Sequence, residues 1–375
     1  MRLLADHCDL YNAALQERRD AWRLRNVNVS YGDQSAQLKE IRAADPDGQG
    51  RHSFTAQQQT LRRLNVVFAA YYRRSKDAKK RQNGGKVGYP RFKPHQRFDQ
   101  VLFVAGNGSK WEPADHGRWA YASFQAVGRV KVNQHRRAVG RVRTLQVRRD
   151  YRRWYVIVVT ETEPVPLPPT GRCVGIDLGV ARFLTTSHGE VVPNPRFLVA
   201  AQAGIAALQR RRARAQFDSG NCKRIRRQLA REWRKVRNQR RDFHHKTARS
   251  LVDACDAVAV EDLRVEGMTA SAGGTVEQPG INVAAKSGLN RSILDAGWGQ
   301  FLIILTAKAE SAGRRVVRVD PGYTSVTCHT CGARCSRPRQ DAVVCSAHGE
   351  LDADLNAARN IATRAGLGSG QASAA

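Results

Sequence analysis

The sequence predicts a multidomain α/β protein in which a helical domain and a small antiparallel β-barrel precede a larger α/β domain with a metal-binding insertion. Three observations predict it: apolar spacing changes from helical to alternating near residue 86, a proline-rich segment follows, and buried strands then alternate with long helices. The chain has 375 residues, enough for two or three domains. Its hydrophobic fraction of 41% supports real cores and excludes a wholly disordered chain.

The first predicted domain, residues 1–85, has apolar residues at helical spacing. Leu10 and Ala14 belong to one amphipathic helix, and a second helix begins at Ser53 after an Asp-Pro-Asp-Gly turn. This second helix ends in a run of basic residues before a break at Asn83-Gly84-Gly85.

Residues 86–169 change to short alternating segments separated by Gly, Asn and Asp turns, which is typical of a small antiparallel β-barrel or sheet. The proline-rich run Pro164–Pro169 is stiff and extended, so we expect a domain boundary there. The predicted strands are Val101–Val104, Trp119–Phe124, Val127–Val132, Arg141–Val147 and Trp154–Thr160.

The α/β domain is predicted in two parts, 170–321 and 351–365, with an insertion at 322–350 and a flexible tail at 366–375. The order of elements indicates a mixed sheet: three strands come first, then a long basic helical stretch over about 200–252, a strand, a helix and a last strand. The segment Thr269–Gly288 is rich in small residues and is expected to be mobile. The predicted strands are Cys173–Asp177, Phe183–Thr186, Val191–Val192, Ala257–Glu261 and Val316–Val319, with a helix over Ile293–Gly313.

The charge of the chain points to a polyanionic partner. There are 63 Lys and Arg against 33 Asp and Glu, a formal net charge of +30. An anionic membrane surface is the alternative, but the basic segments lack one strong amphipathic face. No apolar run approaches the ~18 residues that a membrane helix needs. We therefore expect a nucleic-acid-binding protein with no membrane partner. The N-terminus lacks the long apolar run of a signal peptide, so we expect the protein in the cytoplasm; the sequence does not settle its oligomeric state, and we favour a monomer.

Most of the positive charge falls in the segments Arg73–Arg97, Arg129–Arg153 and Arg210–Arg249. Arginine dominates them, which suits bidentate phosphate contacts that give affinity but little sequence readout. Of the aromatic residues near the first segment, Tyr71 and Phe92 are expected in the core. The residues expected to contact nucleic acid are Arg73, Arg74, Lys79, Lys80, Arg91, Lys93, Arg226, Arg227, Arg234 and Arg237.

Four of the eight cysteines lie close together, whereas a secreted disulfide framework would spread them through the chain. The pairs Cys328-x2-Cys331 and Cys345-x2-His348 have the spacing of two knuckles that close a tetrahedral Zn²⁺ site. Cys335 is an alternative to His348 as the fourth ligand, although His348 keeps the second knuckle regular. A complete four-ligand shell leaves no open position, so we expect one structural Zn²⁺.

Three acidic positions lie where buried elements begin or end. Asp177 and Glu261 end two apolar strands, and Asp352 and Asp354 open a helix. Carboxylates at the ends of adjacent strands can converge, and without a cation they would raise one another's pKa. Two Mg²⁺ ions between them would neutralise the cluster and support phosphodiester hydrolysis. Taken singly, each carboxylate has an ordinary structural role, such as a helix N-cap for Asp352.

These acidic residues stand in longer motifs. They are Gly175-Ile176-Asp177-Leu178-Gly179, Val260-Glu261-Asp262-Leu263, and a zinc ribbon that runs directly into Asp352-x-Asp354-x-Asn356-Ala357-Ala358-x-Asn360. Gly88-Tyr89-Pro90-Arg91-Phe92-Lys93 and Tyr323-Thr324-Ser325 extend the pattern. In this order, the motifs resemble the split RuvC-type nuclease core of the TnpB family, which comprises transposon-encoded RNA-guided endonucleases related to type V CRISPR effectors.

The resemblance implies an RNase H-like (RuvC) core with a zinc-ribbon insertion, preceded by a β-barrel wedge domain and a helical recognition domain. It implies that Asp177, Glu261 and Asp354 are catalytic and hold two Mg²⁺ ions, with Asp352 in a supporting or capping role. The implied function is Mg²⁺-dependent cleavage of double-stranded target DNA, guided by RNA from the transposon end. The alternatives are a nuclease-inactive RNA-guided repressor and a transposition accessory protein that binds DNA without RNA.

The sequence departs from the family pattern at two places. The fourth zinc position, usually cysteine, is His348, which still supports zinc. The family usually has a β-strand ahead of the position of Tyr11 and Asn12, which this sequence does not show. Either the start of the chain is misplaced or the barrel lacks one edge strand.

Overall fold

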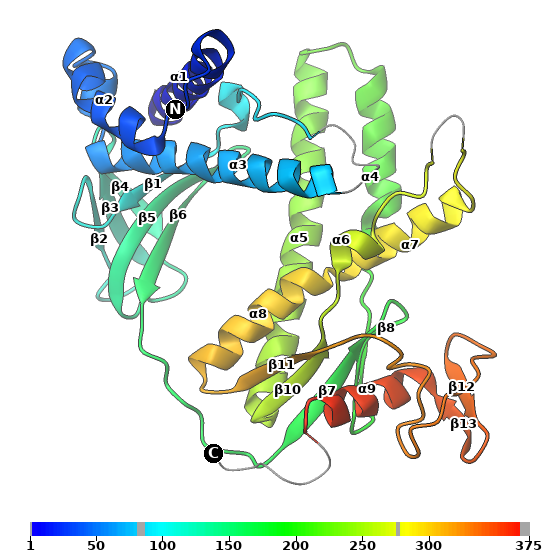
Figure 1. Cartoon of the computed structure of the whole chain (residues 1–375). Coiled ribbons are helices and arrows are strands. Elements are labelled where there is room, and N and C mark those ends of the chain that lie inside the picture. The colour runs from blue at the N-terminus through cyan, green and yellow to red at the C-terminus, as the bar shows by residue number, and fades with distance from the viewer. Residues whose placement is uncertain (1, 81–86, 275–277, 368–375) are drawn as a thin grey trace. The chain divides into compact units, whose positions relative to one another are not determined.

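The computed structural model describes residues 2–80, 87–274 and 278–367 and divides the chain into two compact units, Met1–Glu163 and Pro164–Ala375 (Figure 1). The division falls at the start of the proline-rich run. No helix in these ranges is both long and apolar enough to cross a membrane.

The first unit begins with the helices α1 (Arg2–Arg25), α2 (Tyr31–Ala44) and α3 (Phe54–Lys80). Helix α2 was not predicted as a separate element, although its start has a clear signal: the Ser30 hydroxyl accepts from the Asp33 amide, and the Asp33 carboxylate accepts from the Ser30 amide. The predicted break after α3, at 83–85, lies outside the described residues.

The described strands of this unit form two three-stranded antiparallel sheets, β1–β5–β6 and β2–β3–β4, and no ladder of hydrogen bonds between described residues closes them into one ring. Strand β2 was missed because its four residues have no apolar alternation. The strands are β1 (Gln100–Val104), β2 (Ser109–Glu112), β3 (Trp119–Phe124), β4 (Gly128–Asn133), β5 (Arg141–Asp150) and β6 (Arg153–Glu161).

One hydrophobic core joins the helices and sheets of the first unit. Tyr11 of α1 and Phe68 of α3 belong to the same buried cluster as Phe103 of β1, Phe124 of β3 and Leu145 of β5. The two predicted domains, 1–85 and 86–169, therefore share a core, and a single compact unit contains nearly all of both.

In the second unit, five described strands form a mixed sheet in the order β11–β10–β7–β8–β9. Strands β11, β10 and β7 are parallel, and β8 and β9 continue the sheet as antiparallel neighbours. The strands are β7 (Cys173–Leu178), β8 (Arg182–Thr186), β9 (Val191–Pro193), β10 (Ala257–Glu261) and β11 (Arg315–Val319).

Two predicted helical stretches are each broken by a residue with left-handed backbone. The basic stretch forms α4 (Phe197–Arg214) and α5 (Gly220–Ala254), separated where Asp218 has φ 59° and Ser219 caps α5. The later stretch forms α7 (Val283–Ala296) and α8 (Trp298–Ser311), separated by Gly297 with φ 69°. Because α7 begins at Val283, the last part of the segment expected to be mobile is helical.

Alternating residues of β10 face two different layers. Val258 and Val260 pack in the large core with α5 and α8, whereas Ala257 and Ala259 pack with Ile361 of α9 (Ala353–Arg364) on the other face. Leu367 is buried in this second layer, so the predicted tail begins inside the fold; 368–375 lie outside the described residues. The other elements are α6 (Val265–Met268) and the ribbon strands β12 (Ala342–Cys345) and β13 (Gly349–Asp352).

Candidate functional site

Asp177 and Glu261 lie at the same level on two neighbouring parallel strands. The register pairs Ile176 of β7 with Val260 of β10, and each carboxylate is the next residue along its strand. Adjacent strands lie ~4.8 Å apart. Since side chains alternate along a strand, both carboxylates belong to the face that α9 covers.

Gly175 allows α9 to pack directly on β7. A Cβ at residue 175 would lie 2.2 Å from the carbonyl oxygen of Ala358 and 2.6 Å from the amide nitrogen of Ala362, so no larger residue fits. Asp177 is two residues after Gly175 on the same face, and Asp354 is one helical turn before Ala358. The glycine contact therefore brings the third carboxylate to the other two.

The surroundings of the three carboxyl groups raise the pKa of each one. Burial, followed by the charges of Glu261 and Asp354, raises the pKa of Asp177 to about 7. Burial also raises the pKa of Glu261 and of Asp354. The fold thus collects negative charge that the surrounding side chains do not fully neutralise.

Neighbouring residues orient the carboxylates. The Thr324 hydroxyl donates to Glu261 Oε1 at 2.5 Å, and the Thr324 carbonyl accepts from Asn360 Nδ2 of α9 at 2.8 Å. Asn356 donates to the Thr327 carbonyl at 2.8 Å. The two asparagines of the last motif therefore fasten α9 to the segment that positions Glu261.

Asp352 has the capping role that its position suggested. Its Oδ1 accepts from the Leu355 amide at 2.9 Å, and its Oδ2 lies 2.8 Å from Arg182 Nη1, which is also 3.6 Å from Asp354 Oδ2. Burial alone would raise the pKa of Asp352, but these two hydrogen bonds hold it below its usual value. Both carboxylate oxygens of Asp352 thus have a close partner, whereas Asp354, within the described part of the chain, has only the longer contact with Arg182.

Sequence reasoning missed Arg182 and Arg337. Arg182 comes from β8, and Arg337 comes from the ribbon, where it donates to Ser325 Oγ at 3.1 Å. The Arg337 charge nevertheless lowers the pKa of Asp177 and Asp354, against the larger effect of burial. No spacing in the sequence relates these two arginines to the acidic residues. Thr324, by contrast, stands in the Tyr323-Thr324-Ser325 motif that was identified from the sequence.

The zinc donors predicted from spacing converge. The donor atoms of Cys328, Cys331, Cys345 and His348 all lie within 4.8 Å of one another. His348 Nδ1 is 3.6 Å from the sulfurs of Cys328 and Cys345, and the sulfurs of Cys331 and Cys345 are 3.6 Å apart. A tetrahedral Zn²⁺ with Zn–S bonds of ~2.3 Å requires sulfur separations of about 3.7 Å, so the cluster fits zinc.

Each zinc knuckle ends in a glycine with left-handed backbone. Gly332 follows Cys331 with φ 74°, and Gly349 follows His348 with φ 69°. This conformation turns the chain back after the second ligand at no steric cost. The geometry includes His348 in the donor cluster and leaves out Cys335, whose pKa burial raises to about 11.

Two hydrogen bonds in the ribbon favour ligation. A bond from the Cys331 amide is the main cause that lowers the pKa of Cys328 to about 6, and the bond with His348 is the main cause that lowers the pKa of Cys345. Thiolates are the form that binds zinc, so these two sulfurs are prepared as ligands.

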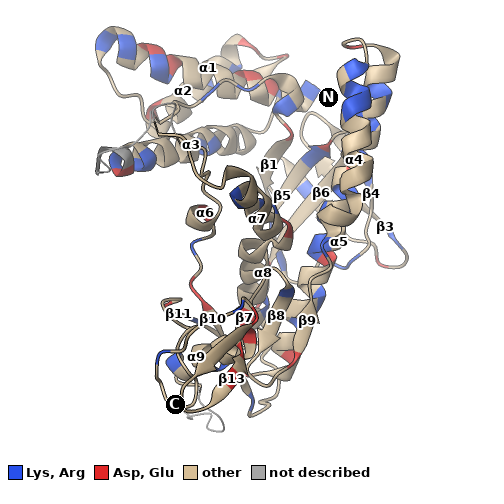
Figure 2. Cartoon of the chain, turned by 90° about the vertical axis from the view of Figure 1, so that its right-hand side faces the viewer, with Lys and Arg blue, Asp and Glu red and all other residues tan. Residues whose placement is uncertain are grey.

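The predicted nucleic-acid contacts lie in both units. Arg73 and Arg74 are exposed on α3, and the side chains of Lys79 and Lys80 are outside the described part. On α5, Arg227 and Arg237 are exposed, whereas Arg226 is half-buried with its guanidinium 5.5 Å from the Phe217 ring. Arg234 is also half-buried on α5, and Figure 2 shows the basic residues along the α4–α5 hairpin. Arg91 and Lys93 lie in a loop of the first unit.

The expectation for the nearby aromatics was wrong for Phe92. Its side chain is 44% exposed, whereas Tyr71 is half-buried against Tyr72 and Tyr89. Phe92 lies in a loop and not in a helix, so no packed face of a regular element covers its ring. The aromatic residues around it in the sequence did not indicate this.

Comparisons with known proteins place the chain. The OrfB_IS605 family model, described as a probable transposase, matches residues 156–272, and the Cas12f1-like TNB domain matches residues 298–361. A relative from Escherichia coli K12, named as a candidate RNA-guided DNA endonuclease, InsQ, is 32% identical over 367 residues, which cover 96% of this chain and 87% of the relative. The chain belongs to the OrfB (TnpB) family.

The chain is also similar to a second curated protein and to solved structures. A relative from Streptomyces pristinaespiralis, also named as a candidate RNA-guided DNA endonuclease, is 30% identical over 368 residues, which cover 94% of this chain and 82% of the relative. Among solved structures, the mini RNA-guided endonuclease CRISPR-Casφ3 covers 96% of this chain and 90% of its own, with 9% identity and a TM-score of 0.49.

Proposed function

We propose that this TnpB-family chain is an RNA-guided DNA endonuclease in which Asp177, Glu261 and Asp354 hold two Mg²⁺ ions for phosphodiester hydrolysis. Two observations support the proposal: Asp177 and Glu261 lie at one level on neighbouring strands, on the face that α9 covers, and the charges of Glu261 and Asp354 both raise the pKa of Asp177. The strand order supports an RNase H-like core: β7, β8 and β9 form an antiparallel edge, and β10 and β11 continue the sheet parallel to β7.

The side chains fit a hard cation. Carboxylate oxygens are the ligands that Mg²⁺ prefers, and the raised pKa of Asp177 indicates negative charge in need of a counterion. Thr185 lies opposite Asp177, and its buried hydroxyl has no hydrogen-bond partner among the described residues. That oxygen is available to a water of a hydrated ion.

The acidic donors are more widely spread than the zinc donors. Within the described residues, the ribbon cluster is the one group of three or more His, Cys, Asp or Glu with all donor atoms that close together. Two ions ~3.5–4 Å apart need ligands spread over a longer distance than a single ion does. The wider spacing therefore suits the two-ion site.

The chain's own residues divide the work. Bound Mg²⁺ would activate a water and stabilise the leaving oxygen. Thr324 fixes Glu261, Arg182 engages Asp352, and Gly175 keeps α9 and Asp354 against the sheet. Exposed arginines of α5 hold backbone phosphates without reading sequence. A four-ligand zinc site is structural and keeps the ribbon folded at the start of α9.

The proposed partners are a guide RNA from the transposon end and double-stranded target DNA, bound by a monomer in the cytoplasm. Guide pairing reads the target, and the basic surfaces supply affinity that falls with salt.

The test is cleavage of a DNA duplex that matches the RNA copurifying with the chain. Wild type should cut with Mg²⁺ and not with EDTA, and Asp177→Ala should lose activity by roughly three orders of magnitude or more. Glu310→Gln, an exposed acid on α8, is the matched control and should cut like wild type. Cleavage by Asp177→Ala at the wild-type rate would reject the assignment.

A further inference from the structure

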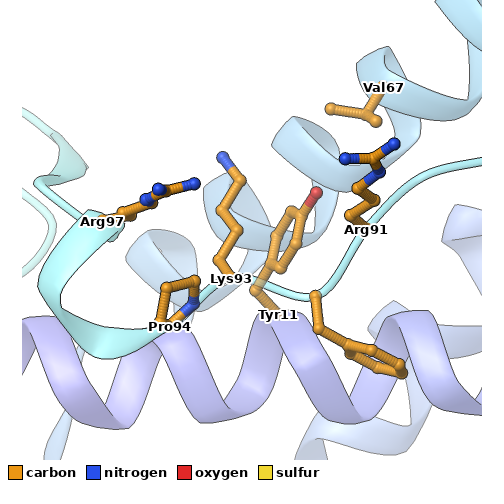
Figure 3. A pocket seen from close by; sticks show the side chains of 7 residues that line it. Tyr11, Val67, Arg91, Lys93, Pro94 and Arg97 are labelled. Carbon is orange, nitrogen blue, oxygen red and sulfur yellow. The ribbon is translucent and has the colours of Figure 1, made fainter.

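A cationic cavity of about 340 Å³ lies in the first unit, lined by α1, α3 and the loop that precedes β1 (Figure 3). Arg91, Lys93 and Arg97 supply three positive charges, and Tyr11, Val67 and Pro94 form apolar walls. In Figure 3 the Lys93 amine and the Tyr11 hydroxyl extend in the same direction, with Arg97 and Arg91 on either side.

These charges lack a protein counterion. In the described ranges, Arg91, Lys93 and Arg97 form no salt bridge. On its own, the carboxylate of Asp99 would raise the pKa of Lys93, but Asp99 already lies 3.8 Å from both Arg63 and Arg148. Burial, and then the charge of Arg63, lowers the pKa of Lys93. Arg91 and Arg97 are exposed and Lys93 is half-buried, so an anion bound among them would interact favourably with all three charges.

The loop that carries these charges is held in place. Asn12 of α1 donates to the Lys93 carbonyl at 2.8 Å and accepts from the Lys93 amide at 2.9 Å. Arg149 of β5 donates to the carbonyls of His95 and Gln96 at 3.1 and 3.2 Å. The next residue after the 3₁₀ turn His95–Arg97, Phe98, is fully buried. The backbone that carries the charges is thus preorganised, which lowers the entropic cost of ordering the loop on binding.

Tyr11 contributes a donor at the centre of the cavity. Its ring is 1% exposed and lies 5.1 Å from Lys93 Nζ. Among the described residues, its hydroxyl has no hydrogen-bond partner. A phenol surrounded by cations can donate to a bound oxyanion, and burial raises the pKa of Tyr11, which keeps the proton on the hydroxyl.

We propose that this cavity binds one nucleotide of the nucleic acid, with its phosphate held by Arg91, Lys93, Arg97 and the Tyr11 hydroxyl. The volume is in the range of small-molecule sites and exceeds what a phosphate group alone requires, and the apolar walls suit a sugar or base. Phe92 is among the lining residues, and its exposed ring, with the Arg19 guanidinium 5.9 Å from its centre, offers a stacking surface at the edge of the cavity. The inference rests on the proposed function only in taking nucleic acid as the partner.

The experiment compares two charge-matched double variants in the Asp177→Asn background with EDTA, so that cleavage plays no part. Arg91→Gln/Arg97→Gln removes two cavity charges, and Arg23→Gln/Arg25→Gln removes two exposed charges at the end of α1. Tyr11→Phe removes only the hydroxyl. One arm measures the affinity of the free protein for its copurifying RNA, and the other measures the affinity of the RNA-loaded protein for the matching DNA duplex.

In one of the two arms, we expect the cavity double variant to weaken the binding affinity roughly tenfold or more. Tyr11→Phe should weaken the affinity in the same arm by a similar factor. The control pair should change it less than about threefold. The affected arm identifies the nucleotide as RNA or DNA. Equal losses in the two double variants, or no loss with Tyr11→Phe, overturn the proposal. If no RNA copurifies, the proposed guide fails, and the cavity is tested with single-stranded oligothymidylate against the same controls.

Discussion

The two candidate metal centres of this chain are built in opposite ways. The zinc donors come from two knuckles of one short ribbon, each turned by its own glycine, and they converge in the folded chain. The carboxylates come from β7, β10 and α9, and they meet only because the strand register and the Gly175 contact hold distant segments together. A local centre depends on its own residues, whereas a non-local centre depends on the whole sheet.

Loss of a zinc ligand should have the largest effect and should reach both centres. Cys345→Ser should remove the bound zinc and unfold the ribbon, at a cost of roughly 5 kcal/mol or more, since structural zinc sites supply folding energy. Cleavage should fall too, because Asn356 and Asn360 tie α9 to the ribbon base. Zinc content by mass spectrometry and a thermal melt measure both effects. Cys335→Ser is the control and should keep its zinc; loss there would restore Cys335 as the fourth ligand.

Gly175→Ala should break the carboxylate centre and leave the zinc in place. The new methyl group would meet the α9 backbone, which we expect to cost about 3 kcal/mol in the free energy of unfolding and to separate Asp354 from Asp177. Denaturant unfolding and a cleavage assay measure the result. Gly204→Ala in α4, where nothing lies within 4 Å, should be neutral or slightly stabilising. Normal stability in Gly175→Ala would show that α9 is not held as described.

Asp177→Asn should stabilise the metal-free protein at neutral pH. The folded-state pKa of Asp177, about 7, lies above its ordinary value of 3.8. The stabilising contribution of the protonated acid is therefore complete below pH 4 and is lost as pH rises through about 7. The variant resembles the protonated form, so its free energy of unfolding should exceed that of wild type by roughly 2–4 kcal/mol at pH 8 and match it near pH 4. Denaturant unfolding curves of both proteins in EDTA, at pH 8 and pH 4, measure this difference. A wild type that is more stable than Asp177→Asn at pH 8 would contradict the proposed charge repulsion.

Asp352→Ala should have the smallest effect and should separate capping from catalysis. Losing the N-cap of α9 is expected to cost about 1 kcal/mol, with cleavage largely retained. Asp354→Ala, two residues further on, should keep the stability and lose the cleavage. Equal activity loss in both variants would place Asp352 among the metal ligands.

Local patterns predicted more of this molecule than non-local ones. The extent of β3 and three of the zinc donors follow from spacing, since neighbours in the chain define them, whereas the folded chain was needed to choose His348 over Cys335. The breaks at Asp218 and Gly297 were missed, although each has a local signal: Ser219 caps the helix that follows the first break, and Gly297 has a left-handed backbone.

Non-local features lay beyond the sequence. The pairing of the first-unit strands into two sheets, the approach of Arg182 and Arg337 to the acids, and the cavity around Tyr11 all depend on tertiary contacts. The carboxylates were predicted as a set because their motifs are specific, whereas the means by which Gly175 and Thr324 assemble them became visible only in the fold.

The most direct test of the central claim is anomalous diffraction from crystals of the RNA- and DNA-bound protein soaked in Mn²⁺ in place of Mg²⁺. The account predicts two manganese peaks among the carboxylates of Asp177, Glu261 and Asp354, and none in crystals of Asp177→Ala. Manganese bound elsewhere, or three carboxylates that point apart around no ion, would contradict it.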